Sequence, residues 1–159
     1  MMKLAAVIGA FAIIAASMLA ACNPNHKIAF SCPPGAQMRG APPPRSDEIW
    51  CQKTVNGRPV KDGPFVVFND NGGKMIEGNY VDGKQDGVWT MRYLNGQREA
   101  IDHYRDGVQN GLHISWYADG VKAIEGEYRD GKREGVWTRW DPNGLRAIKQ
   151  RYRDGKKVS

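Results

Sequence analysis

The stretch YRDGVQNG occupies residues 104–111, and YRDGKREGVW follows it 24 residues later, at residues 128–137. Asp-Gly pairs that begin at residues 82, 106, 130 and 154 extend this spacing in both directions. With the Asp as position 0, Gly recurs at +1, +5 and +14 and Tyr at +22, and these residues include Gly83, Gly87, Gly107, Gly111, Gly131, Gly135, Tyr80, Tyr104, Tyr128 and Tyr152. A fixed period of this length indicates a repeat architecture. The array at residues 58–155 therefore contains repeat 1 (58–81), repeat 2 (82–105), repeat 3 (106–129) and repeat 4 (130–153).

Each repeat contains two short runs separated by turn residues. In repeat 2 the run 88–93 precedes Asn95-Gly96, and the run 97–104 precedes Asp106-Gly107. Asn-Gly and Asp-Gly favour tight turns because these residues tolerate positive φ, and frequent glycines disfavour helix. The pattern predicts an all-β fold, an elongated antiparallel meander of 24-residue hairpin repeats. Repeat 1 begins at Arg58 and has lost the Asp-Gly start of the others.

The second run of each repeat has one apolar face and one charged face. Positions +18, +20 and +22 are mostly apolar, small or Tyr, whereas +19 and +21 are mostly charged. Glycines at +20, such as Gly78 and Gly126, leave room for an aromatic ring over the backbone. Aromatic residues at +7 and +10 have opposite parity, so we expect one set on the core side and the other partly exposed, unless a bulge intervenes. His113 occupies a +7 position, which predicts looser packing in repeat 3.

The composition fits such a sheet better than an ordinary aliphatic core. Leu, Ile, Val and Phe supply 23 of the 138 residues from 22 to 159, below the roughly 20% at which disorder becomes a concern. Five Trp and six Tyr argue against disorder. Because an aromatic side chain buries about 150–250 Å², rings stacked between repeats can replace the missing aliphatic residues.

The N-terminus has the pattern of a secretory signal. Lys3 precedes a run from Leu4 to Ala21 without charge. The run ends in Leu19-Ala20-Ala21-Cys22, which resembles the bacterial lipobox. The resemblance implies a signal peptide at 1–21, lipid attachment at Cys22 and a lipid-anchored linker at 22–31. Asn23, where an Asp would favour the inner membrane, favours the outer membrane of the cell envelope; an uncleaved membrane helix is the alternative.

Lipidation of Cys22 would leave Cys32 and Cys51 as a pair in an oxidising compartment, which predicts a structural disulfide. A metal pair or a redox pair is the alternative, but neither CxxC spacing nor a His at ligand spacing is present. Residues 32–57 are Pro-rich and are expected to form a rigid, disulfide-closed loop that caps the array. At the C-terminal end, residues 154–159, Lys156 and Lys157 would blunt the sheet edge.

The two stretches quoted first resemble MORN-type repeats, in particular the bacterial variant of antitoxin-like and envelope proteins. The resemblance covers residues 58–155. It implies an elongated, twisted antiparallel sheet of successive hairpins. For function it implies membrane-associated or protein-binding scaffolds.

Catalytic and metal-binding patterns are weak. No GxSxG, P-loop or HExxH motif occurs. Asp102-His103 with Ser115 cannot form a triad, because adjacent strand residues point to opposite faces. Residues 69–72, NDNG, occupy a hairpin-turn position and lack the ligand spacing of a calcium loop. We expect no catalytic residue, no metal site and no cofactor.

The charge distribution favours binding. The chain carries a formal net charge of +6, and its basic residues interleave with Trp and Tyr. Secretion and interspersed acids argue against nucleic acid and leave anionic lipid or lipopolysaccharide phosphate as possible contacts. Because Trp, Tyr and Arg dominate interaction hot spots, exposed aromatics beside arginine form the candidate binding surface: Trp116, Trp137, Arg139 and Trp140.

The expected function is therefore that of a non-enzymatic envelope lipoprotein. It would be held to the membrane by its N-terminal lipid, and its repeat sheet would bind a protein partner or the envelope surface. The alternatives are a periplasmic, antitoxin-like immunity protein, a module that binds anionic lipid or lipopolysaccharide, and a less favoured envelope hydrolase.

Overall fold

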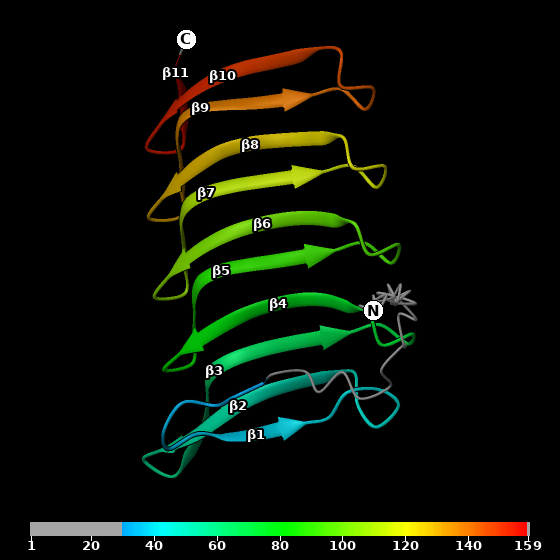
Figure 1. The fold of residues 1–159 in the computed structure, drawn as a ribbon. Helices are drawn as coiled ribbons and strands as arrows, with labels where there is room; N and C mark the ends of the chain where they lie inside the picture. Colours follow the sequence, from blue (N-terminus) through cyan, green and yellow to red (C-terminus); the bar gives the residue numbers. More distant parts are fainter. Residues whose placement is uncertain (1–29, 159) are drawn as a thin grey trace, which may run out of the picture.

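A computed structural model describes residues 30–158 as a single antiparallel sheet (Figure 1). The eleven strands pair strictly in chain order, so each strand hydrogen-bonds to its sequence neighbours. The strands are β1 (Gln37–Gly40), β2 (Glu48–Val55), β3 (Arg58–Phe68), β4 (Lys74–Val81), β5 (Lys84–Arg92), β6 (Arg98–Arg105), β7 (Val108–Trp116), β8 (Lys122–Arg129), β9 (Lys132–Trp140), β10 (Ala147–Arg153) and β11 (Lys156–Val158). The predicted all-β meander of hairpin repeats is confirmed.

The Asp-Gly pairs form the turns that set the period. Asp82, Asp106, Asp130 and Asp154 have φ between 49° and 52°, and the following glycines are also at positive φ. These are the two positive-φ positions of a tight hairpin turn. Repeat 1 has not lost this turn: Asn56 (φ 49°) and Gly57 (φ 74°) form it two residues earlier than the 24-residue spacing predicts. Repeat 1 lacks the Asp-Gly pair of the others, and Asn56-Gly57 makes its turn because Asn and Gly tolerate the same backbone conformation as Asp and Gly.

The hairpins of repeats 1, 2 and 3 each contain a bulge close to the end of their first strand, and the aromatic positions +7 and +10 lie on opposite faces. The register shifts between Val67 and Phe68, between Met91 and Arg92, and between Ser115 and Trp116. The extra residue of each bulge lies on the second strand, so +10 stays on the face opposite the +7 ring, and Phe68 at +10 packs with Val66 and Ile49 there. We call the face that carries positions +7, +9, +18, +20 and +22 the ring face. The opposite face carries +6, +8, +19 and +21.

The N-terminal cap belongs to the sheet rather than preceding it as a loop. β1 and β2 extend the sheet beyond β3, with Trp50 opposite Phe65. The predicted disulfide is present: Cys32 and Cys51 are bonded, with their Cα atoms 5.5 Å apart. Phe30 packs on a small cluster formed by Ile49, Val66 and Phe68. The expectation of a loop missed β1 and β2 because it weighted the prolines, which lie outside both strands.

Neighbouring hairpins are also tied at their turns. Gly107 N–H donates to the Gln85 carbonyl at 2.8 Å, and the turn glycines 83, 131 and 155 make the equivalent bond to the preceding hairpin. On the other rim, the Tyr93 and Tyr117 hydroxyls donate to the carbonyls of Trp116 and Trp140. Each repeat therefore contacts its neighbours through the sheet, the rings and both rims, as in other repeat proteins.

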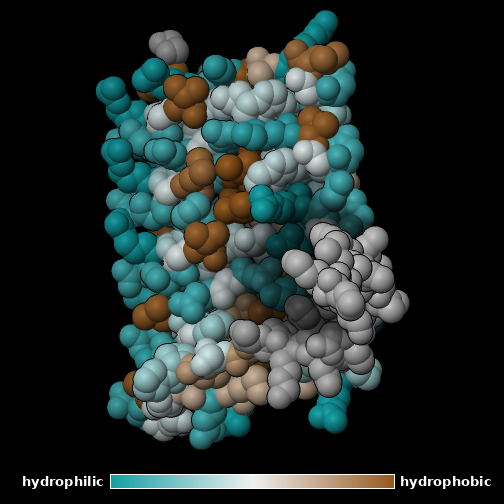
Figure 2. Space-filling model, in the orientation of Figure 1, coloured by the Kyte–Doolittle hydropathy of each residue, from teal (hydrophilic) through white to brown (hydrophobic). Residues whose placement is uncertain are grey.

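The sheet is a single layer across residues 30–158. Nine apolar residues are buried in this part of the chain: Ile49, Cys51, Phe65, Val66, Phe68, Trp89, Ala100, Ala123 and Trp137. Figure 2 shows hydrophobic side chains in small separate groups along the stacked hairpins, among hydrophilic ones. Within the described residues, no helix has the length and apolarity to cross a membrane. The expected signal peptide, Cys22 and most of the linker lie outside the described residues.

Candidate binding surface

A row of side chains crosses the ring face from strand to strand and forms its framework. The row follows the pairing of β3 to β10 and consists of Phe65, Gly78, Trp89, Asp102, His113, Gly126, Trp137 and Gln150. Phe65 and Trp89 lie 5.7 Å apart across Gly78, and His113 stacks on Trp137 at 5.6 Å across Gly126. A Cβ on either glycine would overlap the neighbouring Trp ring. The predicted slot for a ring over glycine is thus present.

Asp102 separates the two ring pairs. It is 4% exposed and accepts hydrogen bonds from His113 Nδ1 at 2.7 Å and Gln109 Nε2 at 3.0 Å. His113 also lies edge-on to Tyr128. The looser packing expected at His113 stays a prediction: its side chain is 17% exposed, more than the buried Phe65, Trp89 and Trp137 at the same position, but the hydrogen bond to Asp102 fixes its place.

A second period of 48 residues accounts for this alternation. IEGxY occurs at 76–80 and 124–128, and GVWT occurs at 87–90 and 135–138. Gly at +20 therefore belongs to repeats 1 and 3, and a polar side chain at +20 to repeats 2 and 4. The doubled period was visible in the sequence and would have indicated the Asp102–His113 contact, which the 24-residue alignment alone missed.

Tyrosines and long polar side chains enclose the rings. Tyr80 and Tyr128 lie edge-on to Trp89 and Trp137 at 5.1 and 4.9 Å. At position +3, Lys61 Nζ lies 4.2 Å from the Phe65 ring centre, and Arg133 lies 4.5 Å from that of Trp137. These cation–π contacts close the exposed side of each ring.

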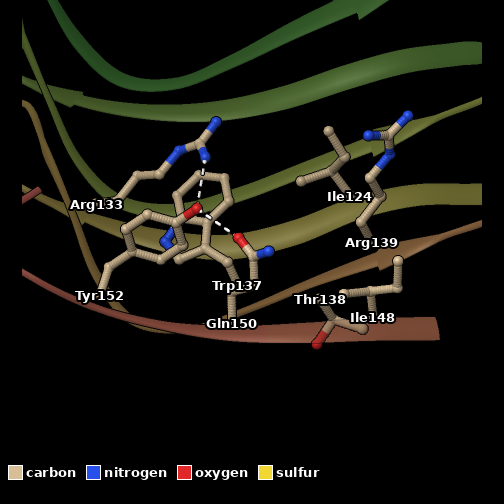
Figure 3. Close-up of a pocket in the computed structure, with 8 residues that line it drawn as sticks. All are labelled: Ile124, Arg133, Trp137, Thr138, Arg139, Ile148, Gln150 and Tyr152. Atoms are coloured by element: carbon tan, nitrogen blue, oxygen red, sulfur yellow. Dashed lines mark hydrogen bonds between the residues drawn. The ribbon is translucent and has the colours of Figure 1, made fainter. Parts of the chain in front are cut away.

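Repeat 4 forms a groove on the ring face together with Ile124 of repeat 3. A hollow of about 220 Å³ is lined by Ile124, Arg133, Trp137, Thr138, Arg139, Ile148, Gln150 and Tyr152. Figure 3 shows Arg133 and Tyr152 at one end and Ile124, Arg139 and Ile148 at the other. A second hollow, which includes Trp140 and Arg146, shares Arg139 and Ile148 with the first. We call the two together the C-terminal groove.

The groove combines arginines that have no carboxylate partner among residues 30–158 with exposed apolar surface. Ile148 is 63% exposed. Among residues 30–158, Arg133, Arg139 and Arg146 have no carboxylate within 4.0 Å, whereas Arg92, Arg105 and Arg129 each do. Arg133 instead donates to the Tyr152 hydroxyl at 3.3 Å. At +9 Arg139 replaces the Val, Met and Ser of the other repeats, so the cationic groove is specific to repeat 4.

The four predicted contact residues do not all form exposed parts of the groove. Arg139 is exposed and Trp140 is partly buried, and both line the groove. Trp137 is 5% exposed beneath Arg133 and against His113, so its expected exposure is wrong. Trp116 is partly buried in repeat 3 and lines neither hollow. Arg133 and Ile148, which the sequence reasoning missed, complete the surface.

At the other end of the array one lysine bridges two aspartates. Lys53 Nζ lies 3.1 Å from Asp62 and 2.6 Å from Asp82. The Asp82 backbone N–H lowers the pKa of Asp62 below its ordinary value of 3.8; burial opposes this and Lys53 adds to it. Burial raises the pKa of Tyr104, and Asp102 adds to this.

The Asp102–His113 pair does not extend to a triad within residues 30–158. His103 donates from Nδ1 to the Leu112 carbonyl at 2.8 Å, away from Asp102. Ser115 lies on β7 two residues beyond His113, but no hydrogen bond joins their side chains in the described part of the chain. No group of three metal-ligating side chains occurs among these residues.

No family model matches the chain, and no curated protein matches it. Among solved structures, the sheet is similar to a chain in the glycosylation-associated protein complex of Streptococcus agalactiae, with 14% identity and a TM-score of 0.38. The similarity covers 72% of this chain and 20% of that chain, so the present protein spans about a fifth of the other's length. A likeness at this level has no bearing on function.

Proposed function

We propose that this chain is a non-enzymatic envelope lipoprotein whose MORN-type repeat sheet binds a protein partner through the C-terminal groove. The observation that carries the proposal is the combination of unpaired arginines with exposed Ile148 and partly buried Trp140 in one groove. Arginine, tryptophan and a central apolar anchor are the residues that supply most binding energy at protein interfaces. The envelope location rests on the signal-like residues 1–21 and the lipobox-like stretch ending at Cys22.

Site-specific photocrosslinking in native membranes tests the protein-binding role. A crosslinker at Ile148 should capture one partner in stoichiometric amount. The same crosslinker at Val88, which is 52% exposed on the opposite face of repeat 2, is the matched control and should not capture it. Equal capture at both positions, or none at Ile148, would remove the groove as the binding surface. A captured toxin would specify the immunity role.

The unpaired arginines also favour a second candidate, in which the groove binds phosphate groups of anionic lipid or lipopolysaccharide. Planar guanidinium groups bind phosphate and carboxylate equally well by paired hydrogen bonds. Mass analysis of the Ile148 crosslinks separates the two candidates, because lipid adducts in place of protein adducts would favour the envelope-surface role.

Lipid anchoring has its own test. The intact mass of the native protein should correspond to a chain that begins at Cys22 and carries acyl groups, and Cys22→Ala should abolish the acylation. A native mass that still includes residues 1–21 would contradict the lipoprotein assignment and leave the groove proposal unaffected.

A further inference from the structure

The face opposite the C-terminal groove carries the complementary charge. A hollow between β7, β8 and β9 is lined by Leu112, Glu125, Gly126, Glu127, Glu134, Gly135, Val136 and Thr138. We call it the acidic hollow. Val136 in it is 45% exposed. The groove and the acidic hollow lie on opposite faces of the same strands, β8 and β9.

The acidic hollow contains an unfavourable arrangement of charges. Glu127 and Glu134 are direct cross-strand partners, and like charges in this position destabilise a sheet. The equivalent pairs are Asn79–Asp86 and His103–Asn110 in the earlier repeats. Glu134 lies 3.8 Å from Arg129, but Glu127 has no cation within 4.0 Å among residues 30–158. A cationic surface placed over this pair would relieve the repulsion.

We infer that the C-terminal groove of one molecule docks on the acidic hollow of a second molecule of this chain. The inference rests on the proposed role of the groove as a protein-binding surface and names its occupant. Arg133 and Arg139 supply positive charge to Glu127, which lacks a cation in the described part of the chain, and to Glu125 and Glu134, whose own partners are Lys122 at 2.6 Å and Arg129 at 3.8 Å. The exposed Ile148 and Val136 supply apolar contact on either side.

The shape of the sheet favours this pairing over face-to-face pairing of like surfaces. When a second molecule with the same twist is placed over the first by a shift along the sheet normal, the two facing surfaces stay parallel. Packed sheets lie about 10 Å apart. On β9, Arg139 of the ring face adjoins Thr138 of the opposite face, whose cross-strand partner is Glu125. Arg133 likewise adjoins Glu134. Such a displacement therefore brings Arg139 toward Glu125, and Arg133 toward Glu134, of the second molecule.

The inferred contact is heterologous, because a different face of each molecule takes part. A heterologous contact that does not close into a ring adds molecules one after another. Association should therefore rise with protein concentration beyond the dimer. It should weaken with salt, because charges at a partly exposed interface are screened.

Charge reversal with complementation tests the contact. Sedimentation velocity at low salt would follow the protein as produced, in mild detergent, so that all variants share the same N-terminal segment. Arg139→Glu and Glu125→Arg should each weaken self-association about tenfold or more, because like charges then meet across the interface. An equimolar mixture of the two variants should recover association and form assemblies in which the two alternate, because the groove of each variant then meets a hollow of opposite charge on the other. Arg153→Glu, an equal charge change outside both surfaces, should associate like the wild type.

Wild-type protein that stays monomeric at a concentration about 100-fold above a micromolar Kd would overturn the inference. So would two variants that fail to recover association when mixed while both remain folded by circular dichroism. Capture of a different protein at Ile148 together with a monomeric chain would keep the proposed function and reject the second molecule as its partner.

Discussion

Asp102 accepts a 2.7 Å hydrogen bond from His113 Nδ1 at the junction of repeats 2 and 3, where the junctions on either side have a Trp ring over glycine. Both residues differ from those of the neighbouring junctions: Asp102 stands at +20 where those junctions have Gly, and His113 stands at +7 where they have Trp. Asp102 is buried, so its carboxylate accepts hydrogen bonds from His113 and Gln109 in place of water. The ring row is therefore continuous within each pair of repeats and polar between the pairs.

Asp102 and His113 should be strongly coupled energetically. Asp102→Gly leaves His113 without its acceptor, and His113→Trp places a ring against a buried carboxylate that keeps only the hydrogen bond from Gln109. The latter change should cost about 3 kcal/mol or more. The double variant reproduces the Gly–Trp contact of the other junctions and should recover about 2 kcal/mol relative to the sum of the single changes. Urea unfolding of the four proteins measures the coupling, and additive effects would show that the two sites do not act as one unit.

The turn spacing and face alternation of residues 58–153 were sufficient to predict the hairpin order and the ring-bearing face. The Cys32–Cys51 bond followed from the cysteine count. β1 was not predictable in the same way, because Gln37–Gly40 has no apolar alternation and is a strand through its pairing with β2. The burial of Trp137 and the openness of Ile148 depend on which ring a neighbouring repeat supplies, so these site properties required the three-dimensional arrangement.

Gly126→Ala should destabilise the sheet through a steric effect at Trp137. A Cβ at residue 126 would overlap the Trp137 ring, which is 5% exposed and held between His113 and Arg133. Overpacking of this kind costs about 1–3 kcal/mol. Gly73→Ala is the comparison variant, because its Cβ would meet the amide of the turn residue Asn69 at 3.0 Å and no aromatic ring, so it should cost less stability than Gly126→Ala. Equal unfolding midpoints for the two variants would mean that the Trp137 ring can move aside.

Loss of the Cys32–Cys51 bond should remove a large share of the stability. The bond links residues 19 apart and anchors the segment that brings Phe30 onto Ile49 and Val66. Constraining a loop of this size contributes about 3 kcal/mol in the chain-entropy description. Cys32→Ser with Cys51→Ser, or addition of reductant, should lower the melting temperature, whereas Cys22→Ala should not. A melting temperature insensitive to both treatments would contradict a stabilising role for the bond.

Asp62 should make the stability depend on pH in the acid range. The Asp82 backbone N–H donates to Asp62 at 2.9 Å and Lys53 lies 3.1 Å away, so the folded-state pKa lies below its ordinary value of 3.8. A lowered pKa means that the carboxylate stabilises the fold above the unfolded-state pKa and loses this effect as pH falls through the folded-state pKa. Asp62→Asn should therefore be less stable than the wild type at pH 7, and the difference should shrink below about pH 4. The free energy of unfolding, measured in urea from pH 7 to pH 2, checks this, with Asp119→Asn in an exposed turn as the control. A difference between wild type and Asp62→Asn that stays constant over this range would show that the ionised carboxylate contributes no stability through these contacts.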